Sequence, residues 1–212
     1  MTSHDVVQHV RRIYGERSIG HLGTLDPFAT GLLVLLLGRA TRLANFLDIE
    51  PKVYEAIVGF GTETDTDDST GTVLRSAPLP AEADVRSALT SLTGTISQIP
   101  PAYSAKSVDG TRAYDAARRG EPLDLQPVEV QVHGWEVRDL NRKSLTATVT
   151  CSGGTYIRAL ARDLGRLTSS AAHLTSLRRT RIGSFDVRDA ATLDALADSP
   201  SKPRMLRVVA DA

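Results

Sequence analysis

Hydrophobic and polar positions at the start of the chain repeat with the period of a helix. Val6, Val10 and Ile13 lie three to four residues apart, which places them on one helical face. Thr2 precedes them as an N-cap, and Asp5 stands in the capping-box position relative to Thr2. A glycine follows the last apolar residue, as is typical of a helix end. The pattern predicts a capped amphipathic helix.

Other stretches have the patterns of β-strands. The run LLVLLL at 32–37 is short and bounded by glycines, which predicts a buried strand. KVYEAIVGFG at 52–61 alternates and is rich in Val, Ile and Tyr. VEVQVHGWEV at 128–137 and SLTATVTC at 144–151 also alternate, and a polar turn joins them. RRTRIGSFDV at 178–187 predicts a last strand.

Helical segments lie between these strands. We expect helices at 40–48, 80–92, 111–119 and in GGTYIRALARDLGRL at 153–167, and a short one after residue 189. TETDTDDSTG, between the second strand and the next helix, is expected to be an acidic loop. Strands and helices alternate irregularly, with hairpin-like pairs in the second half. This order predicts an α+β (mixed α/β) domain.

Composition narrows the class of protein. The chain has 212 residues and is 41% hydrophobic, enough for one ordinary domain with a core. LLVLLL is its longest apolar run, so no membrane span is expected. The N-terminus has no signal-peptide pattern. The single cysteine, Cys151, excludes an internal disulfide and fits a reducing, cytoplasmic location. The histidines and Cys151 show no zinc spacing, so no metal is expected.

The charges are distributed unevenly, although the net charge is zero. Residues 1–100 hold 8 Lys and Arg against 12 Asp and Glu, whereas residues 101–182 hold 13 against 8. This arrangement is compatible with one positive face, as a nucleic-acid partner requires. It is also compatible with an ordinary solvated surface.

Asp26 stands in GHLGTLDPFATG, directly before the most apolar stretch. Asp-Pro is common turn chemistry, and a structural turn is the alternative to a catalytic role. Tyr54 is either a core tyrosine or a functional aromatic. Arg158 is predicted in the first turn of its helix, where a cation is unfavourable, so we expect an anion to hold it. LRRTR at 177–181 is either a solvated strand edge or a phosphate contact.

Nucleotide-binding signatures are missing from the sequence. GGTYIR lacks the GxxxxGK[ST] spacing of a phosphate-binding loop, which argues against an NTPase. No GxGxxG follows the first predicted strand, which argues against a doubly wound fold.

Six blocks in order carry a resemblance to a known family. These are MTSHDVV, GHLGTLDPFATGLLVLLLGRATRLANFL, KVYEAIVGFGTETDTDDSTG, IPPAYSAKSVDGTRAYDAARRGE, CSGGTYIRALARDLG and LRRTRIGSF. Together they resemble the TruB-type tRNA pseudouridine synthases over about residues 1–188. The resemblance implies a catalytic domain at 1–188, with a central, mostly antiparallel mixed sheet flanked by helices, and a short tail at 189–212.

The resemblance also implies an activity. The family isomerises a flipped-out uridine, at the tRNA T-arm position conventionally numbered 55, to pseudouridine without a cofactor or metal. Asp26 matches the essential aspartate, which acts as nucleophile, electrostatic stabiliser or base. Arg158 matches the arginine that keeps this carboxylate ionised, so we expect it to be buried against Asp26. The remaining matches line the uridine pocket: His21, Tyr54, Tyr156 and Leu177.

Several further expectations have less support from the motifs. Arg42, Arg178 and Arg179 are candidate contacts to RNA phosphates, and Asp68 matches a polar family position. Relatives usually begin with one more strand, and they often end with an RNA-binding PUA module. We expect this chain to lack both, and to be monomeric. A catalytically idle tRNA-binding or folding protein on the same scaffold is the alternative function, and a guide-directed relative acting on ribosomal RNA is a third.

Overall fold

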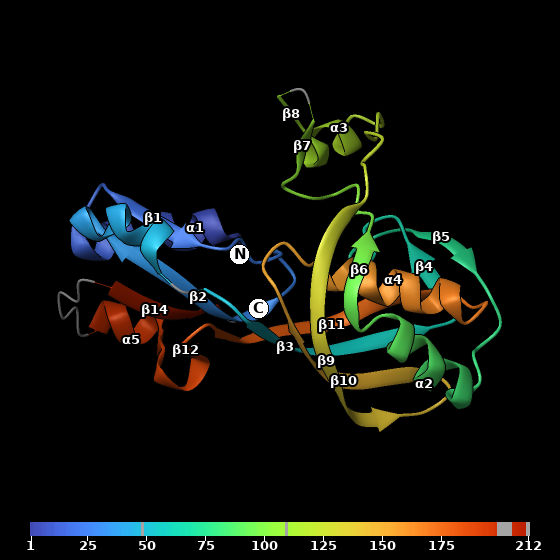
Figure 1. Cartoon of the computed structure of the whole chain (residues 1–212). Coiled ribbons are helices and arrows are strands. Elements are labelled where there is room, and N and C mark those ends of the chain that lie inside the picture. The colour runs from blue at the N-terminus through green and yellow to red at the C-terminus, as the bar shows by residue number, and fades with distance from the viewer. Residues whose placement is uncertain (48, 109, 199–204, 211–212) are drawn as a thin grey trace. The chain divides into compact units, whose positions relative to one another are not determined.

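A computed structural model describes residues 1–47, 49–108 and 110–198, and the backbone of 205–210 (Figure 1). The chain divides into two compact units. The first comprises residues 1–55 and 177–212, and the second comprises residues 56–176. Strands β3 (Lys52–Phe60) and β11 (Ala172–Ile182) carry residues of both units, so each unit is described with its own part of them.

The first unit is built around β2 (Thr30–Leu37). Its strand order is β13-β14-β2-β11-β3, and β1 also pairs with β2. The β2–β11 and β13–β14 pairs are parallel, whereas β1 and β14 both run antiparallel to β2. The other elements of this unit are α1 (Ser3–Tyr14), β1 (Ile19–Leu22), the 3-10 helices η1 (Gly38–Phe46) and η2 (Val187–Asp189), β12 (Phe185–Asp186), β13 (Ala191–Thr192), α5 (Leu193–Asp198) and β14 (Met205–Ala210).

Both faces of β2 are covered, which explains its uninterrupted apolar run. Leu33 and Leu35 pack in a cluster with residues of α1 and α5. The residues that alternate with them, Leu32, Val34 and Leu36, pack in another cluster with Ile182 and Phe185. Side chains of a strand alternate between its faces, so a strand buried on both sides needs apolar residues at every position. The predicted buried strand at 32–37 is confirmed.

The second unit contains the rest of the sheet, in the order β11-β3-β10-β9-β6. β9 (Val128–Leu140) and β10 (Ser144–Cys151) form the predicted antiparallel hairpin, and β10 alternates between buried and half-buried positions. Two two-stranded sheets lie apart from it. The other elements are β4 (Thr62–Thr64), β5 (Val73–Ser76), α2 (Glu82–Ser91), β6 (Gly94–Gln98), β7 (Ser107–Val108), β8 (Thr111–Arg112), α3 (Ala113–Arg118) and α4 (Ile157–Leu167).

Most predicted elements are present, and the mixed, mostly antiparallel sheet with helices is confirmed. Thr2 caps α1, and the capping box with Asp5 forms as expected. The helix expected at 40–48 is a 3-10 helix that begins at Gly38. The segment expected to be a polar tail contains β14, whose backbone pairs with β2. No helix in the described part of the chain is long and apolar enough to cross a membrane.

Candidate active site

Asp26 lies on the loop that joins β1 to β2 in the first unit. We call residues 23–29 the Asp26 loop. The backbone carbonyl of Asp26 accepts a hydrogen bond of 2.9 Å from the N–H of Ala29, which closes a turn over Pro27 and Phe28. The side chain is half-buried and borders a small hollow that Ser3 and Leu25 also line. The local turn chemistry is therefore present, and the half-buried Asp26 lies at the edge of this hollow.

The start of α1 holds this loop on one side. The N–H of Leu25 donates to Oγ of Ser3 at 2.9 Å, and the Ser3 hydroxyl lies 3.3 Å from the carbonyl oxygen of Leu25. Ser3 is buried, at 6% exposure. One serine thus satisfies both backbone groups of the residue before Asp26. Nothing in the sequence pattern indicated this contact.

Arg179 reaches the same loop from β11. Its side chain is 1% exposed, and its guanidinium donates to the carbonyl oxygens of Leu32, Thr24 and Gly23 at 2.9, 3.3 and 3.1 Å. A guanidinium enclosed in this way has no surface to offer a phosphate. The burial of Arg179 therefore argues against the predicted phosphate contact at this residue.

The other predicted residues of the first unit lie on its strands. Tyr54 on β3 and Leu177 on β11 are buried, at 7% and 4% exposure. His21 on β1 is half-buried, and its Nδ1 has no hydrogen-bond partner among the described residues. Burial lowers the pKa of His21, and the positive charges of Arg179 and His4 lower it further. A neutral imidazole is therefore favoured at this position.

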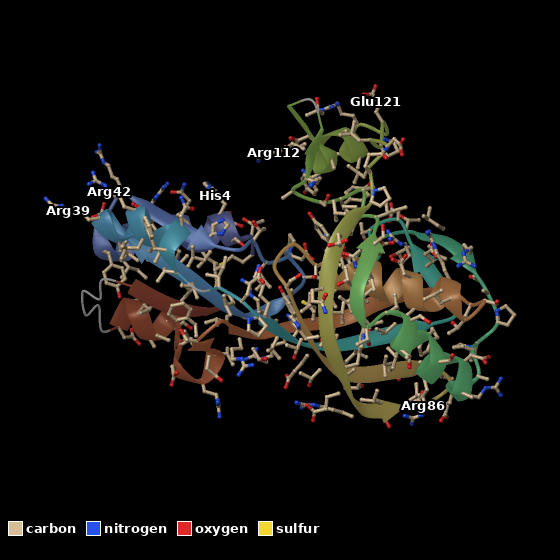
Figure 2. All side chains as sticks on the ribbon, viewed as in Figure 1. His4, Arg39, Arg42, Arg86, Arg112 and Glu121 are labelled. Atoms are coloured by element: carbon tan, nitrogen blue, oxygen red, sulfur yellow. The ribbon has the colours of Figure 1, made fainter. Side chains whose placement is uncertain are left out.

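Two of the candidate phosphate contacts remain accessible. Arg178 is half-buried, and its Nη1 lies 3.4 Å from Oγ1 of Thr30. Arg42 is exposed on η1, where it projects from the ribbon together with Arg39 (Figure 2). Their role as phosphate contacts stays a prediction.

Arg158 belongs to the second unit, where it is the second residue of α4. Its side chain is 4% exposed, and Nη1 lies 3.7 Å from Oδ2 of Asp68. Nη1 also donates to the carbonyl of Thr66 at 2.8 Å, and Nη2 donates to that of Tyr103 at 2.9 Å. The expectation that an anion holds this cation near the helix start is confirmed, with Asp68 as that anion. Its pairing with Asp26 stays a prediction.

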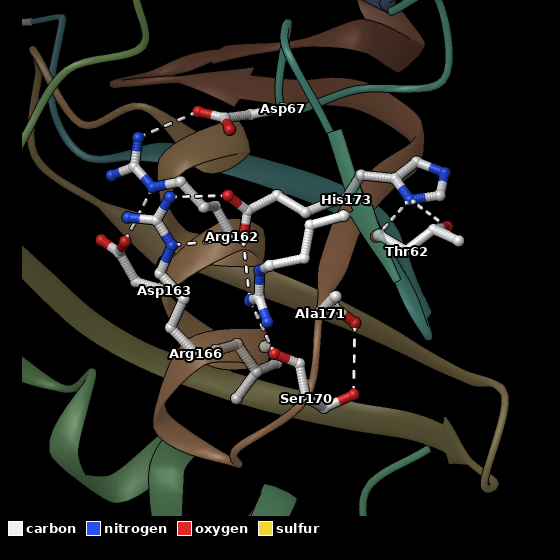
Figure 3. Close-up of polar contacts among 12 residues, drawn as sticks. Thr62, Asp67, Arg162, Asp163, Arg166, Ser170, Ala171 and His173 are labelled. Atoms are coloured by element: carbon white, nitrogen blue, oxygen red, sulfur yellow. Dashed lines mark hydrogen bonds and ion pairs between the residues drawn. The ribbon is translucent and has the colours of Figure 1, made fainter. Parts of the chain in front are cut away.

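Arg158 is the first of three arginines spaced four residues apart on α4, which we call the arginine ladder. Arg162 Nη1 lies 3.0 Å from Oδ2 of Asp67, and Arg166 Nη2 lies 2.6 Å from Oε1 of Glu63 (Figure 3). Residues four apart share one helix face, so the ladder faces the acidic segment 63–68. The spacing of these charges is visible in the sequence, and a charge-pattern search could have found it.

Burial and ion pairing have different net effects on the pKa values of the two acids that pair with Arg162 and Arg166. Burial raises the pKa of Asp67 to about 6, although Arg162 and Arg158 act against it. Burial also opposes ionisation of Glu63, but hydrogen bonds from Arg166 and Arg75 outweigh it and lower the pKa of that carboxyl. Glu63 has two arginine partners within 3.1 Å, and Asp67 has one at 3.0 Å.

The stretch expected to be an acidic loop begins in strand β4 and continues from residue 65 as an ordered loop. Oδ1 of Asp68 accepts from the hydroxyl of Thr66 at 2.8 Å and from the N–H of Thr70 at 2.9 Å. The backbone of Asp68 also forms a bridge with Leu174. The carboxylate of Asp68 is therefore fixed on one oxygen by the loop and faces Arg158 with the other.

Tyr156 is the N-cap residue of α4, and its backbone is held by Gln98. The N–H of Tyr156 donates to Oε1 of Gln98 at 2.9 Å, and its carbonyl accepts from Nε2 at 3.1 Å. Gln98 is completely buried. No sequence pattern indicated Gln98, because an isolated glutamine on a strand has no distinctive spacing.

The structure therefore groups the predicted residues in two sets. The second unit holds Tyr156, Arg158 and Asp68, and the first unit holds Asp26, His21, Arg42, Tyr54, Leu177, Arg178 and Arg179. Among the residues described, no group of three or more His, Cys, Asp or Glu side chains could hold a metal ion.

Comparisons with known proteins agree on one family. Residues 11–157 match the model of the TruB family pseudouridylate synthase N-terminal domain, and residues 158–208 match that of the tRNA pseudouridylate synthase B C-terminal domain. The tRNA pseudouridine synthase B of Thermobifida fusca is 50% identical over 206 residues, covering 92% of this chain and 70% of the relative. That of Mycobacterium ulcerans is 47% identical over 207 residues, covering 95% and 69%.

Two solved structures are similar to this chain in fold. A chain of a Cbf5-Nop10-Gar1 complex superposes with a TM-score of 0.71 at 27% identity and covers 93% of this chain. A chain of an H/ACA RNP bound to a substrate RNA containing 2′-deoxyuridine gives a TM-score of 0.68 at 26% identity. This chain spans about half the length of those two chains, at 50% and 49%.

Proposed function

Because this chain belongs to the TruB family of pseudouridylate synthases, we propose that it is an isomerase that converts uridine to pseudouridine in tRNA, at the T-arm position conventionally numbered 55. The observation that carries this proposal is the match of both family models over residues 11–208. The curated relatives bear the name tRNA pseudouridine synthase B. As part of the proposal, residues 1–188 form the catalytic domain.

The reaction breaks the N1–C1′ glycosidic bond, turns the uracil, and joins C5 to C1′. The proton that leaves C5 is balanced by a proton gained at N1. Cleavage builds positive charge at C1′, so an anion beside the sugar lowers the barrier. We assign that anion to Asp26, because it matches the essential aspartate of the family and lies on a loop that Ser3 holds in place.

The other residues serve binding and charge control in this proposal. The target base must leave its stack, which costs a few kcal/mol, and stacking on an aromatic side chain offsets roughly 1–3 kcal/mol of this cost. Tyr54 supplies that aromatic face, and His21, Tyr156 and Leu177 line the pocket. Arg158 supplies a buried positive charge that favours an ionised Asp26, and Asp68 orients Arg158 through the pair at 3.7 Å.

Release of tritium from [5-³H]uridine in a tRNA transcript tests the activity, since the label leaves C5 when the new bond forms. We expect release with the unmodified T-arm sequence, and none from a transcript in which the target uridine is replaced by cytidine. Background release from folded protein that still binds the transcript would contradict the enzyme and favour the idle tRNA-binding protein. Release that persists after the cytidine replacement would contradict the T-arm assignment.

A further inference from the structure

Arg179 is a fully buried cation that the proposed chemistry does not use. Within the described residues its guanidinium donates to three backbone carbonyls, and two of them, those of Gly23 and Thr24, belong to the Asp26 loop. The third, Leu32, lies on β2, the strand into which that loop runs. Burying a charged side chain is unfavourable unless its hydrogen bonds are satisfied. The loop conformation that presents these carbonyls to Arg179 is therefore favoured over others.

The geometry requires an arginine. Guanidinium is a planar fork with five N–H donors, and here it bridges a strand and a loop at the same time. Nε reaches the strand, and the two Nη atoms reach two consecutive loop carbonyls. Loop carbonyls have no ladder partner, so a side-chain donor can define their orientation.

The backbone of Arg179 is itself tightly fixed. Arg178 and Arg179 pair in parallel with Thr30 and Gly31, where β2 begins. A Cβ at Gly31 would lie 2.2 Å from the carbonyl oxygen of Arg179, so the two strands approach here more closely than a side chain allows. Arg179 is therefore anchored beside the end of the Asp26 loop.

Ser3 completes the support from another element. Its hydroxyl contacts both backbone groups of Leu25, the residue after Thr24 and before Asp26. Three consecutive residues before the carboxylate, 23 to 25, are thus held by two side chains from distant parts of the chain. Neither side chain has to reach the substrate for this.

We propose that Arg179 is a positioning residue, which holds the Asp26 loop so that the carboxylate is pre-aligned with the sugar of the target nucleotide. The inference rests on the proposed function. Neighbouring strand residues face opposite sides of a sheet. Arg178, the half-buried neighbour, therefore remains a candidate for RNA contact, while Arg179 acts inside the protein.

The test compares Arg179→Met and Arg179→Lys with wild type in single-turnover pseudouridine formation, tRNA binding and thermal unfolding. We expect Arg179→Met to slow the chemical step by ~100-fold, as a misplacement of about 1 Å does, while the Kd for tRNA stays unchanged. Arg179→Lys keeps the charge but not the planar set of N–H donors, so we expect its rate to lie between those of wild type and Arg179→Met. Thr180→Val is the matched control, because its hydroxyl donates to Val53 on β3 and not to the loop.

Several outcomes would overturn the inference. One is an Arg179→Met rate equal to that of Thr180→Val, and another is a weakened Kd with an unchanged rate, which would indicate a phosphate contact. If Arg179→Met does not fold, Arg179→Lys and Ser3→Ala decide instead. A folded Ser3→Ala with a wild-type rate, together with a wild-type rate for Arg179→Lys, contradicts the inference.

Amide hydrogen exchange supplies a readout that is independent of activity. Exchange at residues 24–26 is expected to be faster in Arg179→Lys than in wild type or Thr180→Val. Inactive wild-type protein would defeat the proposed function, yet this exchange result would still decide whether Arg179 holds the loop. Unchanged exchange would contradict the inference.

Discussion

Asp67 is a buried aspartate, and burial disfavours its ionised form. Comparison with Asp67→Asn should reveal this effect as a pH dependence of the free energy of unfolding. Its side chain is 8% exposed, and Arg162 is its ion-pair partner at 3.0 Å. Burial nevertheless raises its pKa to about 6. The ordinary pKa in an unfolded chain is about 3.9. The folded protein therefore binds this proton more tightly than the unfolded chain does.

Because the folded protein binds this proton more tightly, the free energy of unfolding falls as pH rises. A raised pKa contributes stability that is fully present below about pH 3.9 and is lost as pH rises through about 6. The whole difference corresponds to about 3 kcal/mol at 1.36 kcal/mol per pKa unit. Between pH 4.5 and 7.5, integration of the proton difference gives a loss of about 2 kcal/mol in wild type relative to Asp67→Asn.

Urea unfolding of both proteins across this pH range measures the difference directly. Asp186→Asn is the control, because a hydrogen bond from Arg188 lowers the pKa of half-buried Asp186 to about 2. Its stabilising effect is lost only as pH falls below about 4, so its difference curve should stay nearly flat between pH 4.5 and 7.5. A flat or rising curve for wild type minus Asp67→Asn would show that pairing with Arg162, and not burial, controls Asp67.

Two further substitutions test other parts of the structure by the same unfolding measurement. Arg158→Ala leaves Asp68 buried without its partner and should cost about 3–5 kcal/mol, whereas Arg86→Ala on the surface of α2 (Figure 2) should stay within about 0.5 kcal/mol. An equal, small loss for both would contradict the ion pair. Gly31→Ala adds a Cβ at a φ of +102°, 2.2 Å from a backbone oxygen, and should cost at least about 1–3 kcal/mol. Gly134→Ala, with no atom within 4 Å of the added Cβ, is its control, and similar stability of the two variants would refute the close approach of β2 and β11.

The sequence predicted elements where local chemistry determines them. The capping box of Thr2 and Asp5 needs only residues three apart, and the apolar run of β2 reports burial on both faces. β14 was missed, because a short segment after a polar stretch becomes a strand only by pairing with β2. Its register depends on tertiary contacts that no local pattern contains.

The site was predictable to a similar degree. The position of Asp26 and the burial of Arg158 followed from motifs, but the partners of Arg158 are separated from it by up to 92 residues in the chain. Arg178 and Arg179 look alike in the sequence, and strand alternation places them on opposite faces without telling which one is buried. Only the structure shows that Arg179, and not Arg178, is the buried residue.

In the proposed reaction the carboxylate of Asp26 is the essential catalytic group. Asp26→Asn tests it most directly, because the amide keeps the size of the side chain and removes its charge. Single-turnover pseudouridine formation at the T-arm uridine and the Kd for the same tRNA are measured for both proteins. We expect Asp26→Asn to bind tRNA with an unchanged Kd and to form no product above background. A rate near that of wild type would show that Asp26 does not carry out the reaction.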